Sequence, residues 1–371
     1  MRYHAAGALA FVALVAMSIP RMMAVPRMMA VPVAVAPADF ATAQQPQIDV
    51  ATDGTVYVAF GRGEEIFLAV SRDAALTFAP PVRVAQLPKL ALGRRRGPRL
   101  AISGERITLT AISHETGNLL AFHSPNGGRT WDAPVQVNDV SRSAAEGLDG
   151  LASGPDGRMY ATWLDHRAGR TEVYGSESVD AGRTWGANVL VYRSPEKTVC
   201  ECCHPSVAYN AKGDLVVMFR NALEGNRDLW MVTRPAGQSA FGNATRQGMG
   251  HWALAACPMD GGAIVPQRDG SFASVWRRDK EIFFSLPGQP EINFGEGMQP
   301  VALAAPAGVQ LFWQRGSDLL RASTAPGAVP LVVAAGARFP ALAASPRDGT
   351  LFVAYESTAQ NRPGLFVEVV R

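Results

Sequence analysis

The sequence predicts an all-β fold built from a repeated unit of roughly 50 residues. Three observations lead to this prediction. A short polar motif occurs three times at this spacing, an apolar segment of strand length occurs seven times, and the composition favours turns. Only 18% of the 371 residues are charged, whereas 36 are glycine and 26 are proline, as expected of a β-protein with many tight turns.

The polar motif has the form Ser-x-Asp-x-Gly-x-Thr-Trp, and its copies begin at Ser71, Ser124 and Ser178. The third copy matches in full, the second has Asn126 in place of Asp, and the first has Ala75 in place of Gly. An Asp or Asn side chain bonds its own backbone two residues on, and Gly adopts the left-handed conformation. Each copy therefore predicts a turn that ends one strand and leads into the next.

The seven apolar segments are predicted to be the second strand, strand B, of seven successive repeats. They are residues 56–60, 107–111, 159–163, 215–219, 272–276, 309–313 and 351–355. All but the second end on a bulky aromatic residue, and turn sequences such as Asp53-Gly54 and Asp348-Gly349 precede most of them.

The complete repeat is expected to hold strands A to D, with the polar motif between strands C and D. Repeats of this kind predict a β-propeller, with seven blades favoured and six as the alternative. The last repeat lacks a fourth strand, and we expect residues near Gln47 to close the ring by pairing with the last blade.

The polar motif resembles the Asp box, or BNR repeat, of the sialidase superfamily. The resemblance covers nearly the whole of residues 44–371 as architecture, and it implies a β-propeller, with six blades in the sialidase family. The Asp box is a structural turn that also occurs in propellers without sialidase activity. It therefore implies a fold and not an activity.

Residues 1–43 are expected to be a signal peptide and linker, followed by the propeller at 44–371. The apolar run 5–19 has signal-peptide length and is short for a membrane span. Cleavage after Ala43 is preferred over cleavage after Ala36, because Pro37 would follow the latter, and an uncleaved anchor is the alternative. No later segment is expected to span a membrane, so we predict a periplasmic or secreted monomer.

The net charge of +3 is too small to favour a nucleic-acid partner. The one dense basic run, Arg94 to Arg96 with Arg99, is expected to be a solvated loop.

The loops that follow strand B are rich in Arg, Asp, Glu and His, and in a meander blade they share one face with the D–A connections. Guanidinium groups bind carboxylate or phosphate in a bidentate manner. We therefore predict an arginine-lined central funnel that binds an acidic carbohydrate or another anionic ligand without a cofactor. The predicted ligand-binding residues are Arg167, Arg220, Asn221, Arg227, Asp228 and Arg277. The alternative is that these charges only solvate the loops.

The resemblance to sialidases implies an arginine triad, a Tyr nucleophile assisted by Glu, and an Asp acid/base. The candidates are Tyr355, Glu356 and Asp165. Adjacent strand residues point to opposite faces, which weakens the Tyr355–Glu356 pairing. The Arg-Ile-Pro element of the family is also absent, since Gln45-Pro46-Gln47-Ile48 stands in its place. Enzymatic activity is left open, with a sialidase-like exo-glycoside hydrolase as the alternative to a binding protein.

The four cysteines, Cys200, Cys202, Cys203 and Cys257, fall in two D–A connections. An even number in an exported protein favours two disulfides, and Cys200–Cys203 with Cys202–Cys257 avoids a strained vicinal bridge. The first alternative is a thiolate site for Cu or Zn that includes His204, with His251 or Met259 nearby, in a metal-handling protein. The second is a redox dithiol.

Overall fold

The computed structural model describes residues 31–196, 198–305, 308–359 and 361–370. The apolar run 5–19 lies outside the described residues. No helix in the described part of the chain is long and apolar enough to cross a membrane.

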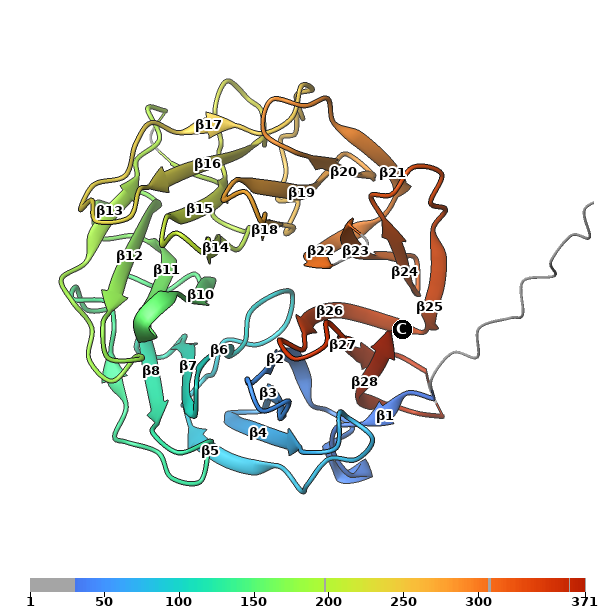
Figure 1. Ribbon diagram of the computed structural model, residues 1–371. Helices are drawn as coiled ribbons and strands as arrows, with labels where there is room; N and C mark the ends of the chain where they lie inside the picture. The colour runs from blue at the N-terminus through green and yellow to red at the C-terminus, as the bar shows by residue number, and fades with distance from the viewer. Residues whose placement is uncertain (1–30, 197, 306–307, 360, 371) are drawn as a thin grey trace, which may run out of the picture.

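Seven four-stranded antiparallel sheets surround a central axis, which confirms the seven-bladed β-propeller (Figure 1). Six blades follow the chain in simple order from the innermost strand A to the outermost strand D. In blades one to three these strands are β2 (Gln44–Val50), β3 (Val56–Arg62), β4 (Glu65–Ser71), β5 (Val82–Gln86); β6 (Arg99–Ser103), β7 (Arg106–Ser113), β8 (Asn118–Ser124), β9 (Val135–Gln136); and β10 (Asp149–Ser153), β11 (Met159–Asp165), β12 (Glu172–Ser178), β13 (Val189–Tyr192).

Blades four to six repeat the same order. Their strands are β14 (Ser206–Tyr209), β15 (Leu215–Arg220), β16 (Leu229–Arg234), β17 (Thr245–Arg246); β18 (Gly262–Pro266), β19 (Phe272–Arg278), β20 (Glu281–Ser285), β21 (Ile292–Glu296); and β22 (Met298–Ala305), β23 (Gly308–Arg315), β24 (Asp318–Ser323), β25 (Leu331–Ala335). Two single turns of 3-10 helix, η1 (Ala38–Phe40) and η2 (Pro155–Gly157), lie between strands.

Blade seven is closed by the N-terminal part of the described chain. It contains β26 (Ala337–Ala344), β27 (Leu351–Ser357) and β28 (Gly364–Val370), and its outermost strand is β1 (Val33–Ala34). The register pairs Val33 with Val367 and Ala34 with Phe366.

The expectation that residues near Gln47 close the ring is therefore wrong, because Gln47 lies in β2 and pairs with Ala59 of the same blade. β1 belongs to the segment that we expected to be a linker before the propeller. The cleavage site stays a prediction.

The Asp boxes form the turns that the sequence predicts, between strands C and D of blades one to three. In the first box the carboxylate of Asp73 accepts hydrogen bonds from Thr77 N and Oγ1 at 2.9 and 2.6 Å. Asp180 and Thr184 repeat both distances in the third box. Ala75 has a φ of 62° at the position where Gly182 has 83°, so the first box keeps the turn despite its alanine.

The hydrophobic core lies between neighbouring blades, where the middle strands pack face to face. The aromatic ends of strand B are buried there, and Phe60, Trp163 and Trp313 each have an exposed fraction of 0%. The cluster between blades six and seven, for example, joins Phe312 and Leu319 to Val353 and Phe366. This packing fixes the inner strands around the axis and so shapes the central channel.

Candidate functional site

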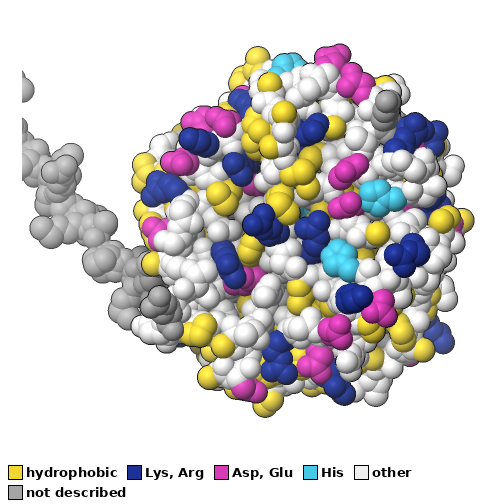
Figure 2. Space-filling view, turned by 180° about the vertical axis from the view of Figure 1, so that it is seen from behind, with side chains coloured by type: hydrophobic (Ala, Val, Ile, Leu, Met, Phe, Trp, Pro, Cys, Tyr) yellow, Lys and Arg dark blue, Asp and Glu magenta, His cyan; other side chains and the backbone are white. Residues whose placement is uncertain are grey.

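The D–A connections and B–C loops share one face of the propeller, which we call the loop face. The A–B turns and the Asp boxes share the opposite face, which we call the turn face. Figure 1 views the molecule from the turn face, and Figure 2 shows the loop face, where basic side chains gather around the centre with acidic ones interspersed. The candidate residues named from the sequence lie mainly in loops of the loop face.

A cavity of about 280 Å³ occupies the central channel and is walled by the inner strands of all seven blades. Its apolar wall includes Ile48, Leu151, Val207, Ile264 and Leu342. Its polar end is formed by Arg95, Arg99, Asp149 and His204, with Ser206 beside them. The segment between β5 and β6, which carries Arg95, reaches into the middle of the ring (Figure 1).

Arg95 joins this segment to the far side of the ring. Its Nε donates to Gln299 Oε1 at 2.7 Å, and its terminal nitrogens donate to the carbonyl oxygens of Gln299 and Pro340, each at 2.9 Å. Arg95 and Arg99 are only 6% and 7% exposed. The prediction of a solvated basic loop is therefore wrong for these two arginines, because carbonyl groups at the start of the inner strands need donors there.

Arg99 lies beside Asp149 at the polar end of the cavity. The Arg99 Nε donates to the Asp149 carbonyl oxygen at 2.9 Å and lies 3.7 Å from Asp149 Oδ1. The other carboxylate oxygen of Asp149 accepts from Thr110 Oγ1 at 2.7 Å, whereas Oδ1 has no hydrogen-bond partner. Burial raises the pKa of Asp149 and lowers the pKa of Arg99.

His204 lies in a part of the channel where nearby arginines create a positive electrostatic potential. Burial lowers the pKa of His204 well below its ordinary value, and Arg95, Arg99 and Arg220 lower it further. The Nδ1 atom of His204 is buried and has no hydrogen-bond partner. The imidazole is therefore neutral at pH 7, and its unpartnered Nδ1 is available for one hydrogen bond with a ligand.

Arg220 does not open into the channel as an anion-binding side chain. It is 1% exposed, and its guanidinium donates to the carbonyl oxygens of Asp260 at 3.0 Å and Arg277 at 3.1 Å, with a further contact to the Arg227 carbonyl. The Trp252 ring lies 5.0 Å from its guanidinium carbon. Arg220 thus holds the loops of blades four and five together.

The other ligand-binding candidates of blades four and five lie around Arg220. Arg277 Nη1 is 3.8 Å from the buried carboxylate of Asp260, Asn221 Nδ2 donates to Tyr192 OH at 2.9 Å, and Asp228 accepts from His251 Nδ1 at 2.6 Å. Arg227 is half-buried and its backbone N–H donates to the Trp252 carbonyl.

Arg167 lies apart from this group, in blade three. It forms two 2.9 Å bonds with the Asp165 carboxylate, one of 2.8 Å with Asp139, and packs 4.0 Å from the Tyr174 ring centroid. Because Asp165 is fully buried and is also bonded by Trp163 Nε1, the Asp165–Arg167 pair is part of the packing of blade three.

The three catalytic candidates are not brought together. Tyr355 is 4% exposed and stacks on Phe366 in the core between blades six and seven, where burial raises the pKa of its hydroxyl. Glu356 accepts from Gln45 N at 2.7 Å and from Arg338 Nε at 2.7 Å, which ties blade seven to blade one. Asp165 lies in blade three. This placement gives the sialidase chemistry no common site.

Three of the cysteines form a buried cluster near the axis on the loop face. The Sγ atom of Cys200 lies 3.6 Å from those of both Cys202 and Cys203, and Met259 packs against the cluster. Cys257 is exposed, and its thiol is one of the groups that affect the pKa of Cys202. All four thiols are free, so the predicted disulfide pairings are not found in the described residues.

The environment of these thiols disfavours the redox alternative. Burial first, and then the neighbouring thiol of Cys200, raise the pKa of Cys203 to about 12. The thiol of Cys202 contributes most to a pKa of about 11 for Cys200. Reactive thiols need a lowered pKa, because the thiolate is the nucleophile. His204 is not among the groups that lie close to all three sulfur atoms.

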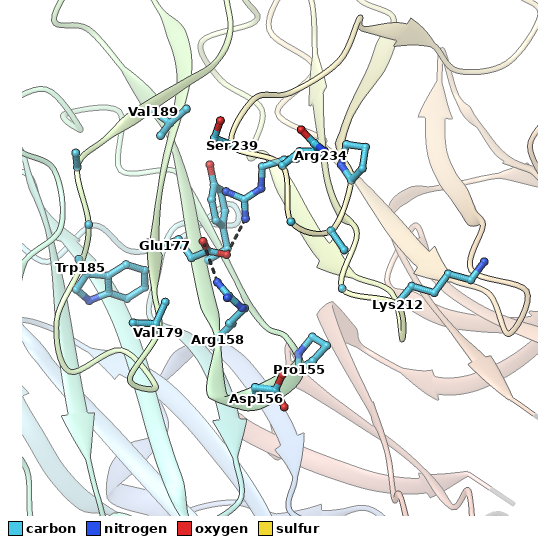
Figure 3. Close-up of a pocket in the computed structure, with 18 of the residues that line it drawn as sticks. Pro155, Asp156, Arg158, Glu177, Val179, Trp185, Val189, Lys212, Arg234 and Ser239 are labelled. Carbon is cyan, nitrogen blue, oxygen red and sulfur yellow. Dashed lines mark hydrogen bonds and ion pairs between the residues drawn. The ribbon is translucent and has the colours of Figure 1, made fainter.

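A larger groove lies elsewhere, on the turn face between blades three and four, with a volume of about 940 Å³. Figure 3 shows Glu177 at its centre, bonded by Arg234 at 2.7 Å and by Arg158 at 3.3 Å. Tyr209 OH donates to the same carboxylate at 2.8 Å. The Glu177 carboxylate is thus fully engaged, and Arg158 is 47% exposed and can be solvated, so the groove holds less buried unpaired charge than the central channel does.

Sequence reasoning missed Gln45, Arg95 and Gln299, which bridge across the axis. The signal available for Arg95 was its position in a D–A connection, directly before an inner strand. All D–A connections begin at the periphery and must return to the axis, so a long side chain at that point can reach the channel.

Comparisons with known proteins identify a fold and no family. No family model and no curated protein matches the sequence. Among solved structures, a protein of unknown function from Dyadobacter fermentans DSM 18053 has a TM-score of 0.55 at 14% identity, over 92% of this chain and 98% of that one.

Two further solved structures are similar at the same level. The Hadza microbial sialidase Hz136 has a TM-score of 0.54 at 14% identity, over 92% of this chain and 68% of its own. YCF48 bound to D1 peptide has a TM-score of 0.55 at 14% identity, over 89% of this chain and 94% of its own. The chain is therefore a seven-bladed β-propeller similar in fold to sialidases and YCF48.

Proposed function

We propose that the protein binds a small acidic ligand in its central channel, as an exported binding protein. The observation that carries this proposal is an excess of buried positive charge at the polar end of the cavity. Arg95 and Arg99 line the cavity and are 6% and 7% exposed, whereas the one carboxylate among its lining residues is that of Asp149. Glu356 does not change the balance, since it pairs with Arg338.

Burial acts on the pKa of both signs of charge. It raises the pKa of Asp149, so the cavity disfavours the ionised form of this carboxyl. Burial also lowers the pKa of Arg95, but only to about 10, so this guanidinium remains charged at neutral pH. Charges inside proteins are paired because an unpaired buried charge is costly. An anionic ligand supplies the missing partner.

The size and polarity of the cavity define the ligand further. A volume of about 280 Å³ lies just below the range for drug-sized ligand sites, roughly 300 to 1,000 Å³, so the ligand must be small. Asp149 Oδ1 can accept one more hydrogen bond, and His204 Nδ1 is unpartnered. A small hydroxy acid meets these requirements, because its carboxylate can pair with Arg99 while its hydroxyl donates to Asp149. Binding is proposed here without catalysis.

Isothermal titration calorimetry with lactate, propionate and phosphate tests this proposal on the whole protein. We expect lactate to bind more tightly than propionate, because only lactate can donate to Asp149. Arg99→Gln removes a charge-assisted hydrogen bond, typically about 1.5 to 3 kcal/mol, so lactate binding should weaken by roughly 10- to 150-fold. Arg99→Lys should recover part of the loss.

The matched control is Arg315→Gln, which removes an exposed arginine from the end of β23. This variant should bind lactate like the parent protein. Equal binding by Arg99→Gln and the parent, or no binding of any of the three acids by the parent, would reject the channel as an anion site.

A further inference from the structure

The sulfur cluster of Cys200, Cys202 and Cys203 is the feature that the proposed function does not use. It is the one group of three or more Cys, His, Asp or Glu side chains in the described residues whose ligating atoms all lie within 4.8 Å of one another. The three side chains are 4%, 9% and 1% exposed. A buried set of three converging sulfur atoms needs a chemical reason.

The sulfur spacing distinguishes the available explanations. A disulfide places its two sulfur atoms about 2.05 Å apart, whereas Cys200 Sγ lies 3.6 Å from both of its neighbours. Three ligands at about 2.3 Å from one tetrahedral ion are separated from one another by about 3.8 Å. The spacing of the cluster is therefore close to that of thiolates sharing a metal ion.

The backbone around the cluster is fixed before any ion binds. Cys200 N donates to the Arg220 carbonyl at 2.9 Å, and Val199 N donates to the Thr171 carbonyl at 3.1 Å. Val199 also pairs with Asn221 as an isolated β-bridge. These bonds attach the loop to the end of β15 and to blade three, so the three sulfur atoms converge without help from a ligand.

The surroundings supply both further sulfur and positive charge. Met259 packs on the cluster, and Arg94 Nη1 lies 3.1 Å from its Sδ atom. Arg220 is close enough to Cys203 to act on it electrostatically. Three thiolates around a monovalent or divalent ion leave a net negative charge, which these guanidinium groups offset.

We propose that Cys200, Cys202 and Cys203 bind one soft d10 metal ion, Cu(I) or Zn(II). Thiolate and thioether ligands favour these ions. The two ions differ in whether they need Cys257, the exposed cysteine near Cys202, as a ligand. Zinc requires a fourth ligand, which Cys257 can provide, whereas three thiolates suffice for Cu(I). None of the three cysteines lines the channel cavity, whereas His204, the residue after Cys203, does. Arg99→Gln should therefore leave metal binding unchanged.

The test uses the whole protein, reduced and kept free of oxygen. Thiols are counted with Ellman's reagent, and Cu(I) and Zn(II) are then titrated separately against competing chelators. We expect four thiols and one equivalent of bound metal. Cys203→Ser should weaken the binding of both ions by more than the 10- to 100-fold typical of outer-shell changes. Cys257→Ser should weaken zinc binding and spare Cu(I).

A folding readout covers the case in which Cys203→Ser does not fold. One equivalent of the bound ion should raise the urea midpoint of the parent protein, because a ligand that binds only the folded state stabilises it. Four free thiols with no metal bound below micromolar concentration would overturn the proposal. Equal affinities of Cys203→Ser and the parent, or protein isolated with no free thiols that takes up no metal after reduction, would do the same.

Discussion

The carboxylate of Glu356 is predicted to hold the seam between blades seven and one. Its Oε1 accepts from Gln45 N at 2.7 Å and Gln45 Nε2 at 3.1 Å, and its Oε2 accepts from Arg338 Nε at 2.7 Å. Glu356 and Gln45 are 3% and 2% exposed, so water cannot replace these bonds without rearrangement. Gln45 also accepts from Arg95 N at 3.0 Å, which couples the seam to the channel.

Glu356→Ala should therefore destabilise the protein by about 2 to 7 kcal/mol. The substitution leaves two buried hydrogen-bond donors of Gln45 without an acceptor, and each costs about 1 to 3 kcal/mol. Arg338 is 47% exposed and becomes solvated, so its lost ion pair adds less than about 1 kcal/mol. Glu356→Gln keeps the Oε1 acceptor and should cost only about 1 to 2 kcal/mol.

Urea unfolding followed by tryptophan fluorescence measures these differences. Glu105→Ala serves as the control, because Glu105 is 80% exposed and its one ion pair is 4.0 Å long. It should change the unfolding free energy by less than about 0.5 kcal/mol. If Glu356→Ala were as stable as Glu105→Ala, the seam would not depend on this carboxylate and the reasoning would be refuted.

Two further predictions concern stability. Burial raises the pKa of Glu368 from 4.5 to about 7, so its stabilising contribution is complete below about pH 4.5 and is lost as the pH rises through 7. Glu368→Gln should exceed the parent in unfolding free energy by about 1 to 2 kcal/mol at pH 8 and match it at pH 4; equal differences at both pH values would contradict this. Gly182→Ala should cost more than Gly225→Ala, since both have positive φ but only at Gly182 would a Cβ lie 2.3 Å from Thr108 Oγ1. Thermal unfolding compares the two, and equal losses would argue against the close contact.

The architecture could be predicted because its signals are local. The hydrogen bonds of the third Asp box run between Ser178, Asp180 and Thr184, all within one turn, so the motif specifies its own structure. The seven strand-B segments likewise indicate seven blades, because each is an apolar run bounded by turn residues. The closing strand β1 has only two residues, and a two-residue strand carries no pattern to detect.

The candidate site could be predicted only in part, because its contacts are long-range. Arg95 belongs to a basic run that resembles a solvated loop, yet it is bonded to Gln299 and Pro340, more than 200 residues away in the sequence. For Tyr355, strand alternation gives the side of the sheet but not the neighbouring blade that covers it. The clustering of the three cysteines could be predicted from their spacing in the sequence. That their thiols are free, and that the His204 ring is not part of the sulfur cluster, could not be predicted.

The most direct test of the central claim is a crystal structure of the protein soaked in bromide, with anomalous data collected at the bromine edge. The excess of buried arginine over carboxylate predicts a bromide ion inside the channel, in contact with Arg99 and near His204. Bromide confined to exposed arginines on the surface, with none in the channel, would contradict the claim that this cavity is built to hold an anion.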